Sequence, residues 1–92
     1  MSDQRQSPPG SQTIFDDTML VAFLKLRDNH VIPQYNAEDK NHIEFRIDGD
    51  PQKIQEDLHA FYSNAPVGVR DYVGSLKTVK SLMYGMKKIM EE

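Results

Sequence analysis

The chain has 92 residues, enough for one domain at most, and a domain of this size has a thin core that binding or oligomerisation often supports. It contains no cysteine, which excludes a disulfide framework and a zinc site built on thiolates. The formal net charge of −3 argues neither for nor against a polyanionic partner. No apolar run approaches the roughly 20 residues of a membrane span, and the first residues lack the apolar region of a signal peptide, so we expect no membrane contact.

The first twelve residues are polar, with two prolines and a glycine, and cannot bury enough apolar surface to offset their chain entropy. We predict a disordered tail over residues 1–12 and a single domain over residues 13–92. The first helix is expected to begin near Thr13, because Thr13 and Asp16 have the spacing of a capping box. The segment MLVAFLKL that follows is apolar on most faces, which predicts a central helix packed on several sides. Asn29 is expected to end it in the left-handed conformation.

A two-stranded antiparallel hairpin is predicted next. Residues 42–48 alternate between polar and apolar side chains, which is typical of a strand with one buried face. The side chains expected to point inward are Ile43, Phe45 and Ile47. Residues 30–35 are the expected partner strand, and Pro33 places that strand at an edge because proline cannot donate to a strand ladder.

A second helix is predicted to start at Asp50 and Pro51. The aspartate suits the N-cap, and the proline suits the first helical position, where its missing N–H costs nothing. Apolar side chains then recur on one face at helical spacing. They are Ile54, Leu58, Phe61 and Tyr62. The sequence SNAP at residues 63–66 is expected to end this helix.

The last helix is predicted to run from Val67 or Gly68 to near Met90. Its apolar residues alternate at spacings of three and four and form what we call the apolar stripe: Val69, Tyr72, Leu76, Val79, Met83, Met86 and Met90. A helix over residues 69–90 would be about 33 Å long. A compact body of about 70 residues is only about 28 Å across, so we expect the first half of the stripe to be core and the last turns to protrude. Gly85 costs a helix about 1 kcal/mol, which leaves open whether the helix continues past it.

The second half of the apolar stripe is rich in methionine, whose flexible thioether adapts to varied apolar surfaces. It is either core or a docking surface. If it docks, the binding mode is a helix in a groove, by which the chain binds a partner protein or a second copy of itself. We predict Leu82, Met83, Met86, Ile89 and Met90 as apolar anchors, with Lys80, Lys87 and Lys88 as a polar rim.

A basic stripe lies beside the apolar one, within about a 100° arc of the helix. Its members are Arg70, Lys77, Lys80, Tyr84, Lys87 and Lys88. Residues 69–88 contain five bases and one acid, Asp71, whereas residues 1–50 contain nine acids and five bases. The basic stripe is either an ordinary solvated face or a nucleic-acid-binding face, in which cations contact phosphates and the aromatic ring stacks on a base.

Catalytic patterns are missing from the sequence. His30 and His42 could face each other across the hairpin and His59 lies on the second helix, but no pair has metal-protease spacing. No glycine-rich phosphate loop or nucleophile elbow is present. We therefore predict no enzyme, no metal site, no cofactor and no small-molecule substrate.

Four segments between Asp17 and Lys88 resemble an uncharacterised family of short bacterial and phage-encoded proteins, a domain of unknown function. The segments are LVAFLKLRDNHVI, IEFRID, QEDLHAFYSN and VRDYVGSLKTVKSLMYG. The resemblance implies a compact helix–hairpin–helix–helix module in a phage or prophage context, and it carries over no catalytic residues. It implies a cytoplasmic protein of the bacterial or infected host cell. The leader and the MKKIMEE end depart from the family pattern.

These observations predict an α+β fold of order α-β-β-α-α, with a two-stranded hairpin packed against three helices and a long C-terminal helix. The predicted function is a non-enzymatic protein-interaction module that docks on a host or phage protein or self-associates through its last helix. Nucleic-acid binding through the basic stripe is the alternative.

Overall fold

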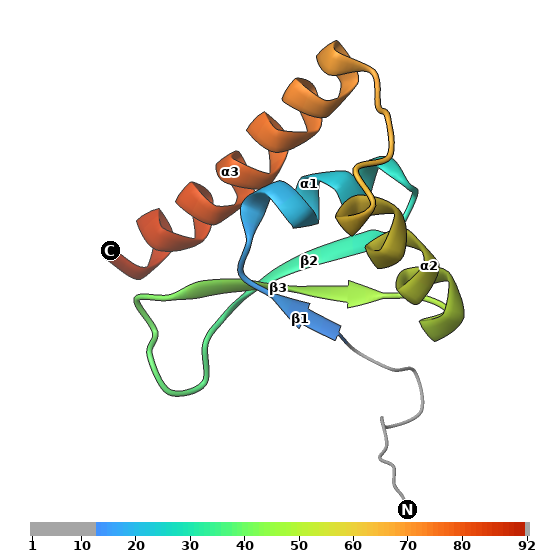
Figure 1. Cartoon of the computed structure of the whole chain (residues 1–92). Coiled ribbons are helices and arrows are strands. Elements are labelled where there is room, and N and C mark those ends of the chain that lie inside the picture. The colour runs from blue at the N-terminus through green and yellow to red at the C-terminus, as the bar shows by residue number, and fades with distance from the viewer. Residues whose placement is uncertain (1–12, 92) are drawn as a thin grey trace, which may run out of the picture.

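The computed structural model describes residues 13–91 and the side chains of residues 13–89, so the predicted disordered tail lies outside it. Within this range the fold is α+β: a three-stranded antiparallel sheet with three helices on one side of it (Figure 1). The strands are β1 (Thr13–Phe15), β2 (His30–Tyr35) and β3 (Ile43–Asp48), and the helices are α1 (Thr18–Leu26), α2 (Pro51–Tyr62) and α3 (Val69–Glu91).

The first strand, β1, replaces the helix start that was predicted near Thr13. Thr13 is opposite Ile47 and Phe15 is opposite Phe45, so β1 adds a third strand to the predicted hairpin. The capping-box prediction is wrong because extended backbone lets Phe15 pack against the core. Asp17 is the actual N-cap of α1. Its carboxylate accepts hydrogen bonds from the backbone N–H groups of Met19 (3.0 Å) and Leu20 (3.4 Å).

The β2–β3 hairpin forms as predicted, with β3 in the middle of the order β1-β3-β2. Strand β2 is therefore an edge strand, and Pro33 lies opposite Phe45. The three inward side chains of β3 are buried, with Ile43 4% exposed and Phe45 and Ile47 fully buried. Strict alternation along β3 thus produces one apolar face toward the helices.

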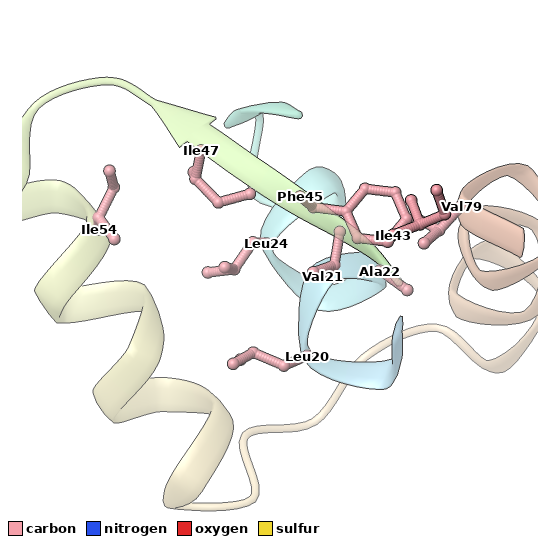
Figure 2. Close-up of a cluster of buried hydrophobic side chains, with 9 residues drawn as sticks. All are labelled: Leu20, Val21, Ala22, Leu24, Ile43, Phe45, Ile47, Ile54 and Val79. Carbon is pink, nitrogen blue, oxygen red and sulfur yellow. The ribbon is translucent and has the colours of Figure 1, made fainter. Parts of the chain in front are cut away.

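Helix α1 is the centre of the core. Its residues Leu20 to Leu24 are all at most 3% exposed, which agrees with a sequence that is apolar on most faces. Figure 2 shows four of them, Leu20, Val21, Ala22 and Leu24, between β3, Ile54 of α2 and Val79 of α3. Each surrounding element therefore contributes buried side chains to one cluster around α1.

The ends of α1 and α2 can be compared with the residues that were predicted to start or end these helices. The left-handed residue after α1 is Asp28 (φ 66°) and not Asn29, whose side chain is buried and hydrogen-bonded. Helix α2 has the predicted N-cap Asp50 and ends at Ser63. Tyr62 was predicted on its apolar face, but it is 73% exposed, whereas its neighbour Phe61 packs against the core.

Helix α3 is continuous through Gly85, which answers the question that this glycine raised. A Cβ at Gly85 would meet no atom within 4 Å, so packing does not require glycine there. The predicted core position of Val69 is wrong, since this side chain is 76% exposed. The first turn of α3 extends beyond the rest of the body (Figure 1). The overhang therefore occurs at the beginning of the helix, whereas it was predicted at the end.

Candidate interaction surface on α3

The inner side of α3 is fixed to the body along much of its length. The Ser75 hydroxyl donates to the carbonyl oxygen of Ala22 (2.8 Å), and the Tyr72 hydroxyl donates to that of Met19 (2.8 Å). Val79 is fully buried between these contacts and the sheet. These contacts hold α3 in one orientation, so the direction that its other side faces is also fixed.

The methionine half of the apolar stripe also contacts the body. Leu82, Met83 and Met86 are half-buried and pack against the core. The hydroxyl of Tyr35, at the end of β2, donates to the carbonyl oxygen of Met86 (2.7 Å). The expectation that these methionines lie beyond the domain is therefore wrong, because the hairpin extends beneath them.

The predicted anchors consequently differ in accessibility. Ile89 is 68% exposed, whereas Leu82, Met83 and Met86 show only part of their surface. The side chain of Met90 lies outside the described part of the chain. Partner binding by these five residues stays a prediction, and Ile89 is the most accessible of the four whose side chains are described.

The opposite side of α3 is open along the helix, and we call it the outer face. Its members are all exposed: Val69, Arg70, Val73, Lys77, Lys80, Tyr84 and Lys88. The exposed fractions of the apolar members are 76% for Val69, 42% for Val73 and 59% for Tyr84. From Arg70 to Lys88 the face is about 27 Å long at 1.5 Å per residue. The outer face includes every residue of the basic stripe except Lys87, which is half-buried.

Charge is unevenly divided between α3 and the rest of the described chain. Residues 69–89 hold five bases and one acid, which gives +4, while residues 13–68 hold five bases and ten acids, which gives −5. The ion pairs among described side chains all lie outside α3. Within residues 13–89, the five cations of α3 therefore have no ion-pair partner.

A buried polar cluster joins the end of α1 to α2, and sequence reasoning missed it. The carboxylate of Asp57 is 4% exposed and accepts from Arg27 (3.0 Å), Asn29 (2.9 Å) and Lys53 (2.8 Å). Burial alone would raise the pKa of Asp57, but the hydrogen bonds from Lys53, Asn29 and Arg27 outweigh burial and lower it. The cluster is structural: Asn29 also donates to the carbonyl oxygen of Leu24, and Lys53 to that of Arg27.

The histidines do not form a common site. In the β2–β3 register His30 is opposite Asp48, so the predicted pairing of His30 with His42 is wrong. His42 lies 3.1 Å from the carboxylate of Asp16, and both side chains are substantially exposed. No group of three metal-ligating side chains is found among the described residues. In the same part of the chain, no helix is long and apolar enough to cross a membrane.

Comparisons with family models, with curated proteins and with solved structures found no match to this chain. The resemblance to short bacterial and phage-encoded proteins is therefore a prediction from the sequence alone. The outer face of α3 is the candidate site because it combines accessible apolar side chains with cations that no described side chain pairs. The sequence predicted its basic residues, but it gave no sign that Val69 and Val73 would join them.

Proposed function

We propose that this chain is a non-enzymatic protein-interaction module, encoded in a phage or prophage context, that docks on a partner protein through the outer face of α3. One observation carries the proposal: Val69, Val73 and Tyr84 are exposed on the same side of α3 as cations that have no ion-pair partner among the described side chains. Covering such apolar side chains is favourable by about 25 cal/mol per Å². Cations around them would orient the partner and raise the rate of association.

Self-association through two facing α3 helices is the weaker version of this proposal. A symmetric contact would bring two outer faces together, each on a helix segment of charge +4. Like charges at an interface are repulsive, and the repulsion is strongest at low salt. The charge therefore favours a different protein as the partner, with a surface of opposite sign.

Site-specific photo-cross-linking in the native host cell tests this function. A benzophenone amino acid at Val73 or Tyr84 reports the outer face, and the same group at Ile14, 48% exposed on β1, is the matched control. We expect one discrete heterologous product from both outer-face positions and none of that mass from the control. Equal products from all three positions would contradict a specific surface on α3. The absence of a cross-linked product from both Val73 and Tyr84 would also contradict it.

Nucleic-acid binding is the second candidate, because five cations and Tyr84 lie along one helix with a single acid, Asp71. The test is fluorescence anisotropy with labelled single- and double-stranded oligonucleotides over a range of salt. Binding that falls steeply with salt and is lost in the Lys80→Glu, Lys88→Glu double variant would support this function. No binding at low salt would eliminate it. The −5 charge of residues 13–68 repels a long polyanion. For this reason we rank nucleic-acid binding second.

A further inference from the structure

A small cleft opens where α1, α2 and the start of α3 meet. It has a volume of about 270 Å³ and is lined by Phe23, Phe61, Asn64, Ala65, Val67 and Tyr72. The rings of Phe23 and Phe61 are tilted against each other at 58°, with centroids 5.5 Å apart. The Tyr72 hydroxyl is already used by the carbonyl oxygen of Met19. The hydroxyl hydrogen of Tyr72 is therefore not available to an occupant, and the ring is its main contribution to the wall.

The cleft adjoins the outer face. Tyr72 on its wall is three residues from Val69, and residues three apart are neighbours on a helix surface. Val67, which also lines the cleft, is 39% exposed and lies two residues before the start of α3. A partner that lies along the outer face would therefore reach the cleft without crossing another element.

The size of the cleft indicates its occupant. Small-molecule sites usually have volumes of about 300–1,000 Å³, so this cleft is below that range and suits a single side chain. Interfaces gain most of their affinity from a few large side chains that fill such pockets. Aromatic walls favour a large apolar side chain, and an aromatic one most, because paired rings attract each other beyond the effect of area burial.

We infer that the cleft between Phe23, Phe61 and Tyr72 is the anchor pocket of the docking surface, and that it takes one large apolar side chain from an acidic segment of the partner. The acidic character follows from charge complementarity, since Arg70, Lys77 and Lys80 lie on the adjoining face without ion-pair partners among the described residues. This inference rests on the proposed function, because it adds a specific anchor and a partner chemistry to that surface.

The probe is a peptide selected by the full chain itself. Random 12-residue peptides displayed on phage are panned against the immobilised 92-residue protein, and the enriched peptides are synthesised with a fluorophore for anisotropy. We expect enriched peptides to contain several acidic residues around one Phe, Trp or Leu. Enrichment of basic peptides, or of acidic peptides without a large apolar residue, would overturn the inference.

Two variants of the protein separate the pocket from the face. Ala65→Phe is designed to fill the cleft, and Lys77→Glu with Lys80→Glu reverses the adjoining charge. The matched controls are Ala37→Phe in the exposed 36–42 turn and Lys25→Glu with Lys40→Glu off α3. We expect each test variant to weaken peptide binding about tenfold or more, and each control to change it less than about twofold.

The outcomes distinguish the inference from the function on which it rests. Binding that survives Ala65→Phe but is lost on charge reversal would overturn the anchor pocket and leave the outer face intact. Binding unaffected by either variant would overturn both. Circular dichroism and urea unfolding establish that Ala65→Phe is folded. If it is not, Val67→Glu at the exposed rim replaces it, with the same expected loss.

Discussion

The buried cluster around Asp57 and the outer face of α3 use charge in opposite ways. In the cluster one carboxylate is surrounded by the side chains of Arg27, Lys53 and Asn29, so its charge is compensated inside the molecule. On the outer face the cations are solvated and have no ion-pair partner within the described side chains. The first arrangement stabilises the fold, whereas the second leaves charge available to another molecule. Substitutions in the two regions should therefore affect different measurements.

The largest expected effect is that of Asp57→Ala. It removes one of the two acceptors of the buried Asn29 amide and breaks the contacts that join the end of α1 to α2. We expect the free energy of unfolding to fall by about 2–3 kcal/mol. This loss is smaller than that for breaking a fully buried ion pair, because Arg27 and Lys53 are partly exposed and water can hydrate them. Urea unfolding followed by circular dichroism measures it. Glu56→Ala, at the exposed neighbouring position, is the control and should stay within about 0.5 kcal/mol.

The two sides of α3 should differ in the same assay. Val79→Ala removes two methyl groups from a fully buried site and should destabilise by about 2 kcal/mol. Val73→Ala makes the same change at a side chain that is 42% exposed, and should cost about 0.5 kcal/mol or less. Equal losses at both positions would mean that the outer face is not the open side of the helix.

Acid should weaken the Asp57 cluster specifically. Because the pKa of Asp57 is lower in the folded protein than its ordinary value of 3.8, its carboxylate contributes stability above that value. This contribution is lost as the pH falls through the folded-state pKa. The difference in unfolding free energy between the wild-type chain and Asp57→Asn should therefore shrink from about pH 6 to about pH 3. A difference that is constant over this range would show that the ionised form is not preferred on folding.

Gly85→Ala should have a smaller effect of opposite sign. A Cβ at this position meets no atom within 4 Å, and alanine is favoured over glycine in a helix interior by about 0.5–1 kcal/mol. We therefore expect a gain of about that size in urea unfolding. A loss of stability would mean that α3 bends or ends at Gly85 in solution.

Local signals predicted the parts of the fold that depend on neighbouring residues. Alternation identified β3, proline identified the edge strand β2, and Asp50 with Pro51 located the start of α2. Strand β1 escaped prediction because three residues carry too little periodicity and form a strand only by pairing with β3, about 30 residues away. A plausible capping spacing at Thr13 and Asp16 then favoured the wrong element.

Local signals likewise predicted only part of the candidate site. Helical periodicity placed Arg70, Lys77, Lys80, Tyr84 and Lys88 on one side of α3, and all five are exposed there. Which apolar residues would join them depended on where the body ends beneath the helix, which no local pattern encodes. For this reason Val69, expected in the core, is 76% exposed, and Met83, in the part of the helix expected to protrude, is half-buried against the core. Asp57 had one local sign, its i,i+4 spacing from Lys53, but its burial depends on Arg27 and Asn29.

The most direct test of the outer face is quantitative capture of the photo-cross-linked partner by three immobilised forms of the protein. These are the wild-type chain, Val69→Glu with Val73→Glu, and the control Met19→Glu, which changes a 56% exposed side chain on α1. We expect the double variant to remain as stable as wild type within about 1 kcal/mol and to lose capture, while the control retains it. Undiminished capture by a folded Val69→Glu, Val73→Glu variant would contradict the claim that α3 docks through its outer face.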